Sequence, residues 1–305
     1  MRALRFHAYG GPEVLQFDDD VPVPEPGEGQ VLIKTAGFGI NPYDWKLREG
    51  IFKDAMPVKF PVTVGNEFSG TIERLGLGVS GLRVGDEVYG SGPGAGAEYL
   101  VATATSVAPK PGLMDLPDAA AVPIGALTAW QALFDVAKLK TGQRVLIQAA
   151  VGGVGSFAVQ LAKWEGAYVI GTSSGRNRSL AIELGVDQFI DYTTTRFEDV
   201  ATSVDVVLET LGGDNPVRSL KTLKPGGIEV VLAAAPPTEE ANAQGKRAVS
   251  YSSKPDRAQL IEIGGLITDL KVRPIIDTVA PFDEAVELFK EIQAGHTVGK
   301  LVARF

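Results

Sequence analysis

The chain has no cysteine, and only two histidines, His7 and His296, occur among its 305 residues. The lack of cysteine excludes disulfides, catalytic thiolates and thiolate-ligated zinc. Two histidines that are far apart in the sequence do not supply a typical zinc site, so we expect no metal ligands. An enzyme with this composition must polarise its substrate without a Lewis-acid metal.

Excess positive charge and long apolar runs are also lacking. The formal net charge is −8 at pH 7, which argues against non-specific binding to nucleic acids. We find no apolar run near the ~18 residues that suggest a membrane-spanning helix. The N-terminal stretch lacks the apolar core of a secretory signal. These absences predict a cytoplasmic protein that binds neither nucleic acid nor membrane, and the length suggests two domains.

Glycine and proline divide the chain into regions of different texture. Residues 1–122 alternate turns with short β-type runs, which predicts an antiparallel or barrel-like domain. In residues 123–272 strands and helices alternate, which predicts a doubly wound parallel sheet and hence an α/β protein. Residues 273–305 contain an amphipathic helix and a closing strand, and we expect them to return to the first domain. The expected strands of the first region are 2–6, 30–38, 68–75, 86–89 and 97–101.

The second region is predicted element by element. Gly185 is expected to end one of its helices as a C-cap, and residues 234–254 are expected to form a polar loop. The expected strands are 145–149, 168–172, 188–190, 204–208 and 228–233. The expected helices are 124–137, 154–165, 178–184, 215–223 and 255–270, with 281–294 in the tail.

The clearest functional signal is the segment Val145–Gly155, VLIQAAVGGVG. A buried strand leads into a glycine-rich turn that opens a helix. Gly152, Gly153 and Gly155 let the backbone approach a pyrophosphate, whose charge the N-terminus of the helix stabilises. Ala150 replaces the first glycine of the G-x-G-x-x-G pattern. The alternative is a tight turn that binds nothing, but the predicted strand and helix on either side favour dinucleotide binding.

The end of the second strand and the residues that follow it, within Tyr168–Arg178, indicate which dinucleotide is bound. NAD sites place a carboxylate at this point, and none occurs here before Glu183. The strand is instead followed by two serines and two arginines: Ser173, Ser174, Arg176 and Arg178. A 2′-phosphate needs such donors and positive charge, although a solvated helix start would look the same. We predict NADPH, with Arg176 as its main phosphate ligand because it is nearer the strand end.

Further motifs occur in a fixed order along nearly the whole chain. They are RAL at 2–4, GGPEVL at 10–15, NPYDWK at 41–46, GNEFSG at 65–70, VGDEV at 84–88, GALTAW at 125–130, the glycine turn and GHTVGK at 295–300. Together they resemble the medium-chain dehydrogenase/reductase superfamily and, within it, the zinc-free quinone oxidoreductases of the zeta-crystallin type. Zinc-dependent members have a histidine ligand where this chain has Asn66, so the zinc alcohol dehydrogenase alternative fails at this ligand as well as at the missing cysteine.

The resemblance implies a fold and an assembly. Residues 1–122 and 273–305 would form a GroES-like β-barrel, and residues 123–272 a Rossmann-like NADPH-binding domain. The active site would lie in the cleft between the two domains, where ligands commonly bind. Members of the family are commonly dimeric through edge strands of the nucleotide domain, so by analogy we expect a homodimer.

The resemblance also assigns residues to the substrate. Asn41 corresponds to an asparagine of the substrate pocket, whose amide would hold a carbonyl oxygen or the nicotinamide ribose; the sequence alone suggests a turn residue before Pro42. Tyr43 is expected to act as a phenolic donor or as a wall of the quinone site, or else only to pack. Thr128 corresponds to a threonine that faces the nicotinamide, with a buried helix residue as the alternative.

The remaining predicted residues contact the cofactor. Tyr192 corresponds to a position near the adenine ribose or phosphate, and Lys300 is expected to approach the cofactor or to cap the last strand. Leu211, in the stretch 210–213 after a strand, would pack on a ribose. The backbone of residues 232–235 would bond the carboxamide, and the glycine turn completes the set. The residues assigned to the cofactor in the glycine turn and in the 232–235 backbone are Ala150, Gly152, Gly153, Val154, Ala233 and Ala234.

The combined prediction is hydride transfer from NADPH to a quinone. The nearest alternative is an NADPH-dependent alkenal/enone reductase with the same fold, which would need a hydrogen-bond donor at the substrate carbonyl and a proton for the α-carbon. A third alternative is an NADPH-binding sensor or structural protein with little turnover. The sequence does not separate these functions.

Overall fold

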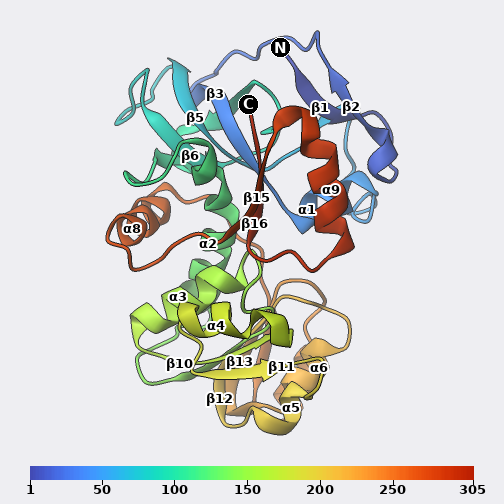
Figure 1. The fold of residues 1–305 in the computed structure, drawn as a ribbon, viewed down its shortest axis with the longest axis vertical. Coiled ribbons are helices and arrows are strands. Elements are labelled where there is room, and N and C mark those ends of the chain that lie inside the picture. Colours follow the sequence, from blue (N-terminus) through green and yellow to red (C-terminus); the bar gives the residue numbers. More distant parts are fainter. The chain divides into compact units, whose positions relative to one another are not determined.

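The computed structural model describes all 305 residues, which form two compact units. Unit 1 comprises Met1–Ile124, Pro255–Leu270 and Pro274–Phe305. Unit 2 comprises Gly125–Lys254 and Lys271–Arg273. Figure 1 shows the elements of both units, with the C-terminal strand (red) among the blue N-terminal strands of unit 1.

Unit 2 is built on a six-stranded sheet of order β11-β10-β9-β12-β13-β14. All neighbouring strands in it are parallel. The order corresponds to 3-2-1-4-5-6 of the Rossmann fold, so the predicted Rossmann-like sheet is confirmed. The strands are β9 (Arg144–Ile147), β10 (Tyr168–Ser173), β11 (Gln188–Asp191), β12 (Val204–Glu209), β13 (Leu223–Val231) and β14 (Arg247–Ser250).

Helices cover both faces of this sheet, which explains why all six residues of β12 are buried. Helices α3 and α4 contact β9 and β10. The other face packs against Phe197, Leu220 and Ala241, from the region of α5, α6 and α7. Helix α4 ends at Gly185, whose φ of 110° is left-handed, as the sequence predicted. The helices are α2 (Pro123–Trp130), α3 (Gly155–Glu165), α4 (Arg178–Leu184), α5 (Phe197–Val200), α6 (Asn215–Ser219) and α7 (Thr238–Ala243).

Three expectations for unit 2 are wrong in detail. Residues 234–254 are not a loop, because they contain α7 and the sixth strand β14. This edge strand has only four residues and buries only Ala248 fully, so it lacks the apolar pattern of an inner strand. The expected helix 124–137 changes to a π-helix at Gln131–Val136. Helix α6 is four residues shorter than expected because β13 begins at Leu223.

The expectation about apolar runs also needs correction. The helical stretch Pro117–Val136 has 20 residues and a mean hydropathy of 1.3, so one helix is long and apolar enough to cross a membrane. The structure buries 78% of its apolar window, which is the placement of a core helix. Length and composition alone therefore do not assign this stretch to a membrane.

Unit 1 contains two sheets. One has the order β2-β1-β4, and the other has the order β15-β16-β3-β5-β6-β8, with β7 paired to β3. The last strand pairs antiparallel with β3, Leu301 opposite Ile40, so the C-terminal tail completes the sheet of the N-terminal segment. The strands are β1 (Ala3–Phe6), β2 (Leu15–Asp18), β3 (Gln30–Ile40), β4 (Val62–Thr63), β5 (Glu67–Leu75), β6 (Glu87–Ser91), β7 (Tyr99–Thr103), β8 (Val107–Pro109), β15 (Ile276–Pro281) and β16 (Lys300–Arg304). The sequence analysis missed β2, β4, β8 and β15.

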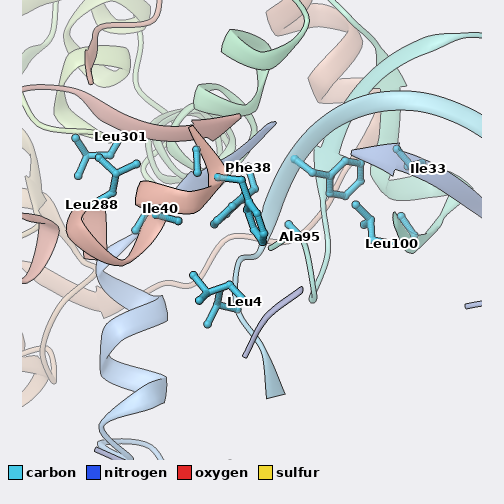
Figure 2. Packing of buried hydrophobic residues seen from close by; sticks show 14 of the residues in the cluster. Leu4, Ile33, Phe38, Ile40, Ala95, Leu100, Leu288 and Leu301 are labelled. Atoms are coloured by element: carbon cyan, nitrogen blue, oxygen red, sulfur yellow. The ribbon is translucent and has the colours of Figure 1, made fainter. Parts of the chain in front are cut away.

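The core of unit 1 joins residues from distant parts of the chain. Phe38 and Ile40 of β3 pack with Leu301 of β16 and Leu288 of α9 (Figure 2). Leu4 of β1 belongs to the same cluster. The helices of this unit are α1 (Pro42–Arg48), α8 (Arg257–Thr268) and α9 (Ala285–Ala294).

Helix α8 belongs to unit 1, although the sequence analysis drew the nucleotide domain as 123–272. The hydroxyl of Tyr89 donates to the carbonyl of Leu260 at 2.5 Å. The guanidinium of Arg257 donates to the carbonyl of Gly81 at 2.6 Å. These long-range contacts are invisible in the local pattern, which shows only a helix following a strand.

Replacing Leu301 by alanine tests the role of the C-terminal strand in this core. Leu301 is fully buried, and a buried Leu→Ala change costs about 2–5 kcal/mol of unfolding free energy. The matched change Leu77→Ala removes a side chain that is 83% exposed and should cost less than about 0.5 kcal/mol. Urea unfolding of both variants measures the difference, and equal losses would show that β16 does not stabilise unit 1.

Candidate functional site

The glycine turn of unit 2 is held by close backbone contacts. A side chain at Gly155, the first residue of α3, would place its Cβ 2.1 Å from the carbonyl oxygen of Ala149. Ala149 itself has a left-handed φ of 48°, which the sequence did not indicate. Gly152 and Gly153 are partly exposed on the turn, while Ala150 is buried beneath it. The N-terminus of the 11-residue helix α3 therefore opens directly from a turn that an anion can approach.

Helix α2 packs against the same turn. A Cβ at Gly125 would lie 2.5 Å from the carbonyl oxygen of Gly153, so only glycine allows this approach. Thr128 is one turn further along α2, is 8% exposed, and donates its hydroxyl to Ser253 Oγ at 2.9 Å. The sequence analysis missed Ser253, because nothing local relates it to a residue 125 positions earlier.

The π-helix that follows α2 holds the end of unit 2. The amide of Gln131 donates to the carbonyl of Lys254 and accepts from its N–H group, each at 2.9 Å. The Tyr251 hydroxyl donates to the same amide oxygen at 2.7 Å. Gln131 thereby fixes the segment that carries Ser253, and with it the partner of Thr128.

The residues predicted for the adenosine phosphate gather at the ends of β10 and β11. The amide of Asn177 donates to Ser173 Oγ at 3.0 Å and to Ser174 Oγ at 3.3 Å. Arg176 and Arg178 are exposed on the turn that follows, and the guanidinium carbon of Arg178 lies 5.3 Å from the ring centre of Phe189. Exposed arginines beside two hydroxyls are a fitting arrangement for a phosphate.

A carboxylate that the sequence analysis overlooked lies beside these residues. Asp191 ends β11 and pairs in register with Ser173 of β10. It accepts hydrogen bonds from the N–H group and hydroxyl of Thr193, at 3.0 and 2.6 Å, and these lower its pKa. A Cβ at Gly175 would lie 2.4 Å from its Oδ2. Tyr192 follows and is 54% exposed.

The ends of β12 and β13 provide two more loops at this edge of the sheet. Glu209 accepts the N–H groups of Leu211 and Gly212 at 2.6 and 2.7 Å. Leu211 is 54% exposed, as expected for a residue that packs on a ligand. Gly212 has a left-handed φ of 75°, and a Cβ there would lie 3.0 Å from the carbonyl oxygen of Ala233. Ala233 and Ala234 are half-buried beside it.

The predicted substrate residue Asn41 belongs to a buried polar network in unit 1. Its amide nitrogen donates to Glu67 Oε1 at 2.8 Å. Its amide oxygen accepts from Lys300 Nζ at 2.5 Å, and Lys300 also pairs with Glu67. Glu67 is fully buried, and its other oxygen accepts the N–H group of Ile124 at 2.8 Å. Lys300 thus lies with Asn41, and its predicted contact with the cofactor stays a prediction.

Asp44 extends this network. Its oxygens accept the N–H group of Asn41 at 2.8 Å and the side-chain amide of Asn66 at 2.7 Å. Burial raises the pKa of Asp44 to about 6, against the opposing effect of these two hydrogen bonds. Tyr43, on the same helix, is 36% exposed and stacks on Phe52 with ring centres 5.6 Å apart. Burial also raises the pKa of its phenol.

The structure has no group of three or more His, Cys, Asp or Glu side chains that could hold a metal ion. Unit 2 brings the predicted phosphate and ribose residues together at the carboxyl ends of its strands, where ligands of parallel sheets bind. Unit 1 brings Asn41 and Lys300 together, and Tyr43 lies on the helix that Asn41 precedes. These arrangements can bind a dinucleotide and offer amide and phenol donors to a second ligand.

Two parts of the chain match known protein families. Residues 27–112 match the family described as alcohol dehydrogenase GroES-like domain. Residues 184–302 match the family described as zinc-binding dehydrogenase. The first match confirms the GroES-like fold expected for the N-terminal region.

Curated proteins of similar sequence include two kinds of reductase. The chain is 36% identical to the 2-methylene-furan-3-one reductase of Solanum lycopersicum, over 99% of this chain and 78% of that protein. It is 33% identical to the NADPH-dependent alkenal/one oxidoreductase of Arabidopsis thaliana, over 99% and 79%. It is 32% identical to the quinone oxidoreductase of Mus musculus, over 99% and 97%.

Solved structures give the same result for the fold. The quinone oxidoreductase from Coxiella burnetii superposes with a TM-score of 0.91 at 34% identity, covering 100% of this chain and 99% of that one. The Escherichia coli quinone oxidoreductase complexed with NADPH superposes with a TM-score of 0.90 at 25% identity, covering 100% of both chains.

Replacing Asp44 by asparagine should remove a pH dependence of stability. The pKa of this carboxyl group is about 6 in the folded protein, and its ordinary value, which applies to the unfolded chain, is 3.8. Between these values the folded state binds more protons than the unfolded state, so this group lowers the free energy of unfolding as the pH rises from about 4 to 6, by on the order of 3 kcal/mol.

Urea unfolding at intervals from pH 4 to 6 measures this effect. The wild type should lose stability relative to Asp44→Asn across this range. The control Asp54→Asn, which changes an exposed carboxylate, should keep the wild-type dependence. Identical curves for the wild type and Asp44→Asn would contradict the assignment.

Proposed function

Since this chain belongs to the zinc-free quinone oxidoreductase branch of the medium-chain dehydrogenase/reductase family, we propose that it transfers a hydride from NADPH to a quinone. The observation that carries the proposal is the convergence of the glycine turn, the serine–arginine turn and the Leu211 loop at one edge of the unit 2 sheet. The chain is also similar over nearly its full length to quinone oxidoreductases from mouse and Coxiella burnetii.

NADPH is the cofactor, as in the Escherichia coli neighbour and as the name of the Arabidopsis relative states. When bound, it supplies the hydride. The residues of unit 2 fit this molecule. The turn before α3 has the close backbone packing at Gly155 that exposes a helix N-terminus to a pyrophosphate. Ser173, Ser174 and Arg176 supply hydroxyls and charge for the 2′-phosphate, and β10 ends without a carboxylate.

Asp191 does not change this assignment. Its carboxylate accepts the N–H group and hydroxyl of Thr193 and lies against the backbone of Gly175. It therefore organises the turn that carries Arg176. A carboxylate engaged in this way is less available to accept the two ribose hydroxyls that define an NAD site.

Asn41 and Tyr43 are the residues that we assign to the substrate. An amide nitrogen has two hydrogens, and the contact with Glu67 uses one. The second hydrogen would donate to a carbonyl oxygen and stabilise the negative charge that a hydride creates there. Lys300 and Glu67 hold the amide in one orientation. A quinone that accepts the hydride also takes one proton from the solvent or a side chain and becomes a hydroquinone.

Reduction of a conjugated alkenal or enone is the second candidate. The tomato and Arabidopsis relatives are named for such substrates. The hydride would add to the β-carbon, the carbonyl oxygen would carry the enolate charge, and the α-carbon would take a proton. The same amide donor of Asn41 would serve this oxygen, so the geometry of unit 1 is compatible with either acceptor.

Two further expectations belong to this proposal. We propose a homodimer that pairs through an edge strand of unit 2. Strand β14 has a neighbour on one side only, and its Arg247 and Ser250 are exposed. We also propose a cytoplasmic location, on the grounds of sequence composition.

Steady-state oxidation of NADPH by a 1,4-quinone and by a simple enone, measured side by side, separates the candidates. We expect turnover of the quinone with NADPH and much slower turnover with NADH. Turnover of the enone alone would move the protein to the alkenal/enone reductases. Tight binding of NADPH without turnover of either compound would indicate a sensor or structural protein instead.

Replacing Arg176 by alanine should raise the KM for NADPH by about 10–100-fold, because charge-assisted hydrogen bonds contribute about 1.5–3 kcal/mol. The KM for NADH and the kcat with either cofactor should change little, since the 2′-phosphate does not react. Arg178→Ala is the matched comparison; its guanidinium stacks on Phe189, so its effect on KM should be smaller. Equal losses with NADPH and NADH would refute the role of Arg176 in phosphate binding.

A further inference from the structure

A cluster of polar side chains is buried inside unit 2, on the face of the sheet that α5, α6 and α7 cover. Glu209 of β12, Glu229 of β13 and Gln148, which follows β9, are all fully buried. Glu229 of β13 pairs in register with Val207 of β12. Glu209 lies two residues after Val207 on the same strand, so its side chain is on the same face of the sheet as that of Glu229. Gln148 donates its side-chain amide to Ser219 Oγ of α6 at 3.0 Å. Carboxyl groups in such a position are rare unless they are compensated.

Most acceptor oxygens in this cluster lack a donor. Oε2 of Glu209 and Oε1 of Gln148 are buried without a hydrogen-bond partner, and neither oxygen of Glu229 has a partner at hydrogen-bond geometry, with the Ser219 hydroxyl as its one neighbouring donor. No lysine or arginine pairs with either carboxyl group. Buried acceptors without donors are costly, and an unpaired buried carboxylate is costlier. A proton on one carboxyl group would supply the missing donor and remove one of the two charges.

Electrostatics indicates which group carries the proton. Burial raises the pKa of Glu229 to about 8, the nearby Glu209 carboxylate adds to this effect, and the Ser219 hydroxyl opposes it. Burial also raises the pKa of Glu209, but the N–H groups of Gly212 and Leu211 oppose that change. The hydrogen bonds from the loop favour the charged form of Glu209, so of the two carboxyl groups Glu229 is the one that holds the proton.

Glu209 connects this cluster to the cofactor edge of the sheet. Its Oε1 accepts the N–H groups of Leu211 and Gly212, which form the turn after β12. The hydroxyl of Thr210 donates to the backbone carbonyl of Gln148 at 3.2 Å. The position of Leu211, which we assign to a ribose of NADPH, thus depends on where the Glu209 carboxylate lies.

We propose that Glu229 holds a proton near the charged Glu209, and that this arrangement positions the Thr210–Gly213 loop for NADPH. Glu229 acts through Glu209, so both are positioning residues, and the proposal rests on the proposed function. Loss of the proton would leave two buried carboxylates on the same face of the sheet. Their repulsion would displace Glu209 from the two N–H groups of the loop, and the affinity for NADPH would fall.

The other ionisable groups on the surrounding elements have partners or are exposed, and Lys246, just before β14, donates to the carbonyl of Leu220 and to the side chain of Gln244. Glu198 of α5 pairs with Arg218 of α6 and with Arg196. Asp205, at the opposite end of β12, pairs with Lys224. Glu239 and Glu240 of α7 and Arg247 of β14 are exposed. Among the neighbouring charges, Glu209 is therefore the one that acts on the Glu229 carboxyl group.

The test measures the dissociation constant of NADPH directly, by equilibrium titration at pH 7 and pH 9. If binding raises the pKa of the pair by one unit from about 8, the constant should rise about fivefold between these pH values. Glu229→Gln, which imitates the protonated acid, should show less than a twofold rise. The control Glu239→Gln, on the exposed surface of α7, should keep the fivefold rise. An unchanged constant in the wild type, or an equal rise in Glu229→Gln, would overturn the proposal.

An infrared measurement covers the case in which Glu229→Gln does not fold. The wild type should show a carboxylic-acid C=O band at pH 7 that is lost by pH 9, and no such loss would overturn the protonation of Glu229. The outcomes also separate the two proposals. If NADPH does not bind at pH 7, the proposed function fails. If NADPH binds and reduces the acceptor with a pH-independent dissociation constant, only the carboxyl-pair proposal fails.

Discussion

The buried ammonium group of Lys300 is the constraint on which unit 1 depends. A charge without water is tolerable only beside an opposite charge and further hydrogen-bonding groups, and here these are Glu67 and Asn41. The three residues come from β16, the start of β5 and the end of β3, so the C-terminal tail must return to the N-terminal sheet for the charge to be compensated. The same requirement orients the amide of Asn41 and leaves it a single hydrogen to offer a ligand.

Backbone contacts play the corresponding role in unit 2. Two glycines, Gly155 and Gly125, let a carbonyl oxygen approach where no side chain would fit. Because Gly155 lies against Ala149, helix α3 begins directly after the turn. Because Gly125 lies against Gly153, helix α2, which carries Thr128, packs against the same turn. Because the carboxyl ends of parallel strands lie at one edge, loops far apart in the sequence then lie together there. The dinucleotide site follows from strand order and from these two contacts.

Local patterns account for the parts that the sequence predicted. The strand before the glycine turn, helix α3 and the C-cap at Gly185 each depend on residues close in sequence. Asp191 was missed because its relation to Ser173 arises from the register between two strands. Strand β14 was missed because a short edge strand needs no apolar alternation. Glu209 and Glu229 each end or interrupt an apolar run, and nothing in either run shows that the two carboxyl groups share a face.

The Glu67 and Glu229 carboxyl groups are therefore compensated in different ways. In unit 1 Lys300 pairs with Glu67. In unit 2 no cation pairs with Glu209 or Glu229, and a proton is the remaining means of compensation. A lysine must be supported by an ordered side chain from another strand, whereas a proton needs no space and can leave. The residues of unit 1 that we assign to the substrate are thus supported by a lysine–carboxylate pair, and the loop that we assign to the cofactor is supported by a protonated carboxyl group that the solvent can deprotonate.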